Sequence, residues 1–126
     1  MKEKLNCILL IDDDQANNFL NKRTIDKMDC TEHIDVAENG QIALNLLASN
    51  TFDVILLDLQ MPVMNGFTTI RNIRDVMNIS TPVIAVTGLT QYDEKQKCLN
   101  AGMNDYLSKP FKKEDLFRKL YKYLGK

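Results

Sequence analysis

The sequence lacks the features that mark several large protein classes. Its three cysteines, Cys7, Cys30 and Cys98, are widely spaced and form no CxxC pair, so neither a disulfide framework nor a zinc site is expected. A single histidine leaves soft transition-metal sites without ligands. No apolar run approaches the roughly 18 to 20 residues that span a bilayer, and the apolar segment before Asp12 is too short for a signal peptide. We therefore expect a cytoplasmic protein with no membrane partner.

An excess of charge of either sign is also missing. The 126 residues carry 16 basic and 17 acidic side chains, which gives a net charge of −1. No basic field is left to attract nucleic acid, so a nucleic-acid partner is not expected. With 44% hydrophobic residues, a chain of this length fits one globular domain.

Short apolar runs alternate with amphipathic segments along the chain. The apolar runs predict strands at residues 7–11, 34–37, 53–59, 82–87 and 105–108. The amphipathic segments predict helices at residues 15–28, with Phe19 and Leu20 inward, and at 40–49, 66–77, 92–100 and 112–124. Strands that are apolar on both faces and alternate with helices indicate an α/β fold with a doubly wound parallel sheet. The second run alternates with polar residues, which fits an edge strand.

Polar side chains stand at or just past the ends of four predicted strands. In chain order they are Asp12 and Asp13, Asp58, Thr87 and Lys109. The carboxyl ends of parallel strands meet at one edge of the sheet, where α/β proteins bind their ligands. We therefore expect these side chains to converge on one site.

Three carboxylates in a partly desolvated cleft repel one another unless a cation holds them together. Mg²⁺ fits best, because it prefers oxygen ligands and keeps waters, with room for a phosphate oxygen. A metal, a lysine and a hydroxyl around one carboxylate are the parts that phosphoryl transfer needs, and Asp58 is the natural nucleophile. Asp14 is interpreted as the N-cap of the first helix rather than as a ligand.

Four motifs resemble the receiver (CheY-like) domain of two-component response regulators. They are the acidic pair after the first strand, LLDLQMPVMNG around the third, VIAVTG on the fourth and YLSKPF on the fifth. The resemblance covers residues 4–124 and implies one receiver domain over residues 1–126, with a flavodoxin-like sheet of strand order 2-1-3-4-5 and five helices. It implies a Mg²⁺-dependent phosphoacceptor, supplied by a histidine kinase or a histidine phosphotransfer protein, that switches a face for a downstream partner. No external substrate is turned over.

The resemblance also carries the metal site over residue by residue. Asp58 matches the phosphoacceptor, and Asp13 matches the direct metal ligand. Asp12 would act on the metal through water, and the backbone carbonyl of Gln60 would complete the protein ligands.

The remaining roles concern the phosphoryl group and the switch. Lys109 matches the lysine that pairs with the phosphoryl group, and it precedes Pro110, whose peptide bond is cis in the family. Thr87 matches the hydroxyl that closes onto the phosphoryl group, and Tyr106 matches the aromatic residue that follows it inward.

Other interpretations of the same residues stay open at this point. Acidic residues 12–14 alone could be a solvated helix N-terminus. A DxD from Asp12 and Asp14 is also found in phosphohydrolases of the haloacid dehalogenase type, although Ala16 and the Pro110–Phe111 pair depart from that pattern. A degenerate receiver would bind partners without phosphorylation. A receiver domain excised from a hybrid histidine kinase is as compatible with AGMNDYLSKPF as a standalone regulator is.

Overall fold

The structure is a computed structural model that describes residues 7–27, 33–59, 61, 64–88, 92–108 and 111–124. One parallel sheet has the strand order β2-β1-β3-β4-β5. Its strands are β1 (Cys7–Ile11), β2 (His33–Ala37), β3 (Val54–Asp58), β4 (Val83–Thr87) and β5 (Asp105–Ser108). The helices are α1 (Gln15–Asp26), α2 (Gly40–Ser49), α3 (Gly66–Arg71), α4 (Tyr92–Asn100) and α5 (Lys113–Leu124), and α3 continues into a π-helical segment, η1 (Asn72–Val76). The predicted fold is confirmed.

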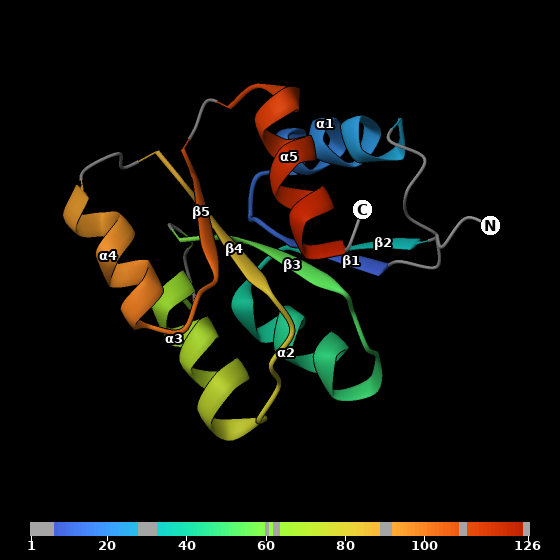
Figure 1. Cartoon of the computed structure of the whole chain (residues 1–126). Helices are drawn as coiled ribbons and strands as arrows, with labels where there is room; N and C mark the ends of the chain where they lie inside the picture. Colours follow the sequence, from blue (N-terminus) through green and yellow to red (C-terminus); the bar gives the residue numbers. More distant parts are fainter. Residues whose placement is uncertain are drawn as a thin grey trace.

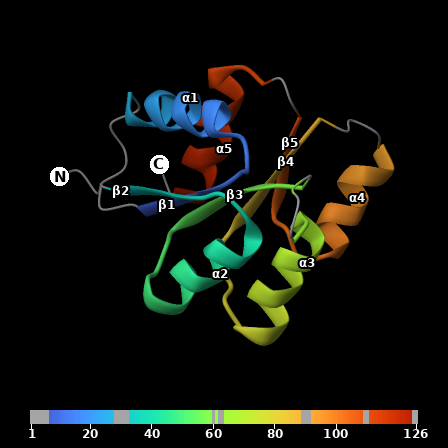
Figure 2. The same ribbon diagram turned by 180° about the vertical axis from the view of Figure 1, so that it is seen from behind.

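Helices cover both faces of the sheet, which explains why the strands are apolar at almost every position. Helices α1 and α5 lie on one face, and α2, α3 and α4 lie on the other (Figures 1 and 2). Alternate strand residues therefore enter two separate cores. The core under α1 and α5 includes Ile8, Leu10, Val54, Leu56, Ile84 and Val86. The core under α2, α3 and α4 includes Leu9, Ile11, Ile55, Leu57, Val83 and Ala85.

The edge strand predicted from the sequence is confirmed. β2 lies at the edge of the sheet, and its first residue, His33, is exposed and bonded to Asp35 at 2.7 Å. Cys98 is buried in the core under α2, α3 and α4, and the partly buried Cys7 packs against the same core. Among the helices within the described residues, none combines the length and apolar character needed to cross a membrane.

The predicted orientation of α1 is wrong. Phe19 and Leu20 are 60% and 59% exposed, and the buried residues of this helix are Asn18 and Ile25, seven positions apart on one face. In this orientation the Asn18 amide donates a hydrogen bond to the main-chain oxygen of Asp12 at 2.8 Å, and Ile25 packs in the core. The buried face of this helix therefore pairs an amide with one apolar residue, which the rule that apolar side chains face inward does not predict.

Arg74 in η1 ties together two loops at the amino-terminal end of the sheet. Its guanidinium donates to the carbonyl oxygens of Gly102 at 2.9 Å and of Ile79 and Thr81 at 2.8 Å each. A fourth bond reaches Oδ1 of Asn104 at 2.8 Å. Burial lowers the pKa of the Arg74 guanidinium from its usual value, and the four acceptors compensate by holding the charge.

Candidate functional site: an acidic cluster

Three carboxylates meet at the carboxyl ends of β1 and β3. Oxygens of Asp12, Asp13 and Asp58 all lie within 4.8 Å of one another. The register pairs Ile11 with Leu57, so Asp12 and Asp58 stand side by side as the next residues of adjacent parallel strands. Both are buried, at 6% and 4% exposure, whereas Asp13 is exposed. The predicted convergence of these three carboxylates is confirmed.

Asp12 is held in place by the turn that leads into α1. Its Oδ1 accepts a hydrogen bond from the Asp14 N–H at 2.9 Å, and its own N–H donates to the Ala37 oxygen at 3.0 Å. Asp14 caps the helix, since its Oδ1 accepts from the N–H groups of Ala16 and Asn17 at 2.9 and 3.2 Å. The interpretation of Asp14 as an N-cap is confirmed, and its carboxylate is directed toward the helix backbone.

The start of α3 packs closely beside Asp58. The Gly66 N–H donates to the Leu59 oxygen at 3.1 Å, and a Cβ at position 66 would lie only 2.7 Å from the Leu59 Cα. The same Cβ would lie 3.0 Å from the main-chain oxygen of Asp58. Only glycine permits this approach, so the NG pair at the end of LLDLQMPVMNG fixes the chain next to the acidic cluster.

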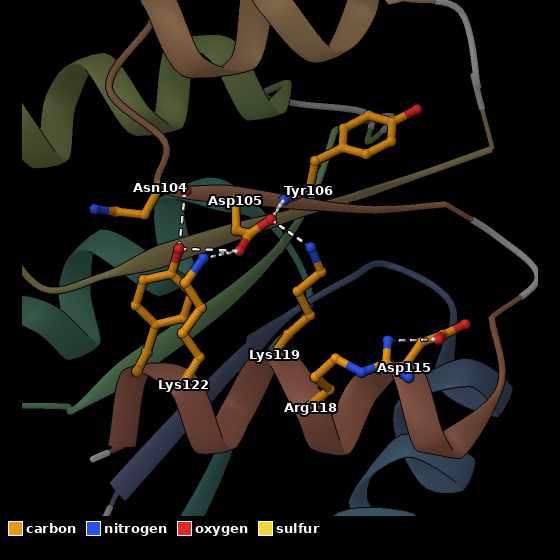
Figure 3. Close-up of polar contacts among 8 residues, drawn as sticks. Asn104, Asp105, Tyr106, Asp115, Arg118, Lys119 and Lys122 are labelled. Carbon is orange, nitrogen blue, oxygen red and sulfur yellow. Dashed lines mark hydrogen bonds and ion pairs between the residues drawn. The ribbon is translucent and has the colours of Figure 1, made fainter. Parts of the chain in front are cut away.

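Thr87 and Tyr106 lie on adjacent strands and share one face of the sheet. Thr87 is fully buried at the end of β4, one residue past Val86, which pairs with Asp58. The register pairs Ala85 with Tyr106 and Thr87 with Ser108, so all four side chains project from the same face. Tyr106 is half-buried, and its ring lies on the side of β5 away from α5 (Figure 3).

Comparison with known proteins identifies the family. The response regulator receiver domain family matches residues 8–121. The chain belongs to this family. Hybrid signal transduction histidine kinase B of Dictyostelium discoideum is 37% identical over 134 residues, which covers 95% of this chain and 7% of the kinase. Two-component response regulator ORR41 of Oryza sativa is 33% identical, with 92% of each protein covered.

A solved receiver domain has the same fold. The receiver domain of sensor histidine kinase PA1611 from Pseudomonas aeruginosa, described with a magnesium ion coordinated in its active-site cleft, superimposes with a TM-score of 0.84 and is 31% identical. The alignment covers 97% of this chain and 99% of that one. The receiver spans only 7 to 13% of the length of the histidine kinases that it matches. It is homologous to receivers of hybrid kinases and of response regulators, as expected for a phosphorelay protein. Because the chain belongs to the receiver family, the dehalogenase-type alternative is excluded.

The acidic cluster of this receiver fits a hard divalent cation. Its donors are carboxylate oxygens, which Mg²⁺ prefers, and the two buried members gain from a cation that offsets their repulsion. The exposed Asp13 leaves the cluster accessible from solvent. Three predicted site residues, Gln60, Lys109 and Pro110, lie outside the described residues.

Asn18 is a residue of this region that the sequence interpretation missed. It is buried on α1, and its amide contacts Asp12, a member of the cluster. A signal was present, because Ile25 is seven residues away and shares the helical face of position 18.

Proposed function

We propose that this receiver is a Mg²⁺-dependent phosphoacceptor, with Asp58 as the residue that carries the phosphoryl group. The observation behind the proposal is that Asp58 is a buried carboxylate at the end of the central strand, with oxygens of Asp12 and Asp13 within 4.8 Å. The donor would be a phosphohistidine of a histidine kinase or of a histidine phosphotransfer protein. We take residues 1–126 as one receiver domain, with its core at residues 4–124.

The chemistry follows from the residues of the cluster. An oxygen of Asp58 attacks phosphorus, the new O–P bond forms, and the P–N bond to the donor imidazole breaks, with its electron pair leaving on nitrogen. Asp12, Asp13, Asp58 and the Gln60 carbonyl would hold Mg²⁺, which when bound supplies positive charge against the phosphoryl oxygens. Lys109 would pair with those oxygens. Water later attacks the phosphorus of the acyl phosphate, which releases inorganic phosphate and restores the carboxylate. The proposal includes no reaction besides this self-phosphorylation and autodephosphorylation.

The acceptor assignment is tested by labelling with Mg²⁺ and acetyl phosphate. We expect wild type to gain one phosphoryl group by intact-protein mass spectrometry and Asp58→Asn to gain none, because the amide is a far weaker nucleophile. Asp53→Asn is the matched control, since Asp53 precedes the same strand at its opposite end, where its carboxylate accepts from the Cys7 N–H at 2.8 Å. Undiminished labelling of Asp58→Asn would refute the assignment.

Thr87 and Tyr106 would couple the phosphoryl group to a face that binds a downstream protein. A ligand shifts a two-state equilibrium only through its differential affinity for the two states, and the Thr87 hydroxyl would supply that difference. We expect Thr87→Ala to accept the phosphoryl group still, but to show much smaller amide shifts around Tyr106 and α5 when beryllofluoride is added. Shifts as large as those of wild type would contradict this coupling.

A further inference from the structure

Asn18 has a buried oxygen atom that has no hydrogen-bond partner among the described residues. The residue is 5% exposed, and its Nδ2 donates to the main-chain oxygen of Asp12 at 2.8 Å. This bond fixes the orientation of the amide, because a flipped amide would press Oδ1 against a carbonyl oxygen. Oδ1 then meets no donor in the part of the chain that the structure describes. Buried acceptors are almost always satisfied, so a donor is expected at this position.

A small cavity adjoins the Asn18 side chain. It has a volume of about 10 Å³. Its polar lining comes from Asp12, Asn18, Asn21 and Asp58, and its apolar lining from Leu10, Ile11, Leu56, Val86 and Phe111. A single water molecule needs about 10 to 15 Å³ and two to four polar partners. The cavity is therefore large enough for one water and too small for an organic ligand.

The chemistry of the lining favours water over other occupants of this size. Asn18 Oδ1 and the carboxylates of Asp12 and Asp58 are acceptors, so the occupant must be a hydrogen-bond donor or a cation. The soaking experiment described below separates these two occupants. Water can donate to two of them at once. An anion would be repelled by both carboxylates.

We propose that this cavity holds one buried water, which donates to Asn18 Oδ1 and to a carboxylate of Asp12 or Asp58. Asn18 would then be a positioning residue for the acidic cluster. It would hold Asp12 through the direct bond to its main-chain oxygen and hold the carboxylates through the water. Mutation of groups that orient metal ligands in this way typically costs about 10- to 100-fold in metal affinity. The consequence for Mg²⁺ rests on the proposed function, whereas the water site does not.

The water is tested by high-resolution crystal structures of the metal-free wild type and of two leucine variants. Asn18→Leu removes the donor and the acceptor, keeps the branching of the side chain and adds apolar volume next to the cavity. Asn17→Leu is the matched control, since Asn17 neighbours it on α1, is half-buried and does not line the cavity. We expect one ordered water on Asn18 Oδ1 in wild type and in Asn17→Leu, and none in Asn18→Leu. A dry cavity in wild type, or Mn²⁺ found in it after soaking, would overturn the assignment.

The positioning role is tested by Mg²⁺ titration followed by NMR on the folded proteins. We expect the dissociation constant for Mg²⁺ to rise roughly 10- to 100-fold in Asn18→Leu and less than about twofold in Asn17→Leu. A purely structural role would lower the melting temperature and leave the dissociation constant of the folded protein unchanged. Asn18→Ala, which enlarges the cavity instead of filling it, gives a second measurement if the leucine variant does not fold. Wild-type Mg²⁺ affinity in the Asn18 variant that folds would overturn the role.

The results of the crystal structures and of the Mg²⁺ titration do not depend on the labelling experiment. Failure of Asp58 to accept a phosphoryl group would remove the proposed function, and the water and the Mg²⁺ titration would still report on Asn18.

Discussion

Buried carboxylates occur at both ends of the strands of this sheet, and their surroundings differ. At the amino end of β5, Asp105 is 8% exposed and accepts a hydrogen bond from Lys119 Nζ at 2.6 Å. Lys122 Nζ lies 3.5 Å from its second oxygen, and the Tyr123 hydroxyl donates to the same oxygen at 3.0 Å. Figure 3 shows the Asp105 carboxylate directed toward the two lysines of α5, on the opposite side of β5 from the Tyr106 ring.

At the carboxyl ends of β1 and β3, a buried carboxylate instead has other carboxylates as neighbours. Asp12 and Asp58 lie together with Asp13, all within 4.8 Å. Around Asp105 the chain itself supplies cations. Burial alone would raise the pKa of the Asp105 carboxyl, but hydrogen bonds from Lys119, the Tyr106 N–H and Tyr123 outweigh it and hold that pKa below its usual value. Lys119, Lys122 and Tyr123 thus surround the Asp105 carboxylate, and the cluster of three carboxylates is suited to an external cation.

The largest difference between the two sites should be in Mg²⁺ binding. We expect Asp13→Asn to weaken Mg²⁺ at least about tenfold in a calorimetric titration, because a ligand and a formal charge are both lost. Asp14→Asn removes the same charge from the next residue and keeps the N-cap, since asparagine caps as well as aspartate does. It should change the affinity less than about threefold. Equal effects of the two variants would show that Asp13 contributes only general charge.

Removing the internally paired carboxylate should destabilise the fold. We expect Asp105→Asn to lower the free energy of unfolding by about 1 to 2 kcal/mol at pH 7 in urea titrations, because charged hydrogen bonds from Lys119 and Tyr123 are weakened. The folded pKa of Asp105 lies below its ordinary value of 3.8, so this stabilisation is present above that pH and is lost as the pH falls through the lowered folded pKa. The difference between wild type and variant should therefore shrink in acid.

The control for the Asp105→Asn experiment is an exposed ion pair on α5, the helix that carries Lys119. Arg118 Nη1 lies 3.0 Å from Asp115 Oδ1, and the Arg118 side chain is 71% exposed. Arg118→Gln should change the free energy of unfolding by less than about 0.5 kcal/mol. An equal loss in Asp105→Asn and Arg118→Gln would mean that the buried pair adds nothing.

At the acidic cluster we expect an effect on stability that is smaller than that of Asp105→Asn and opposite in sign. Without metal, Asp13→Asn should raise the free energy of unfolding by about 0.5 to 1 kcal/mol, because one of three mutually repelling charges is removed near the surface. Added salt should reduce the gain by screening the repulsion in wild type. If Asp13→Asn instead lost stability in low salt and in the presence of a chelator, the three carboxylates would not repel one another in the metal-free protein.

The sequence located the carboxylates of the cluster because a charge that ends an apolar strand is conspicuous, and the parallel sheet then brings such residues together. Residues 7–11, 40–49, 92–100 and 105–108 were predicted with the bounds that the structure has. Asn18 was missed because an amide side chain on a helix is usually exposed, whereas this one is 5% exposed and bonded to the main-chain oxygen of Asp12.

The helix predicted at residues 66–77 becomes π-helical from Asn72. Within that segment Arg74 bonds to acceptors as far away as Gly102 and Asn104. Local pattern cannot foresee such contacts, because they depend on where the rest of the chain folds.

The Arg74 contacts also bear on how the loops at the amino-terminal end of the sheet fold and locally unfold. They join segments 28 and 30 residues apart in sequence, so forming them requires a long stretch of chain to be ordered first. Because one guanidinium bonds to Ile79, Thr81 and Gly102, a displacement of Arg74 breaks its bonds to both loops at once. The two loops therefore form a single cooperative unit, and their amide hydrogens should exchange through one shared opening event rather than two separate ones.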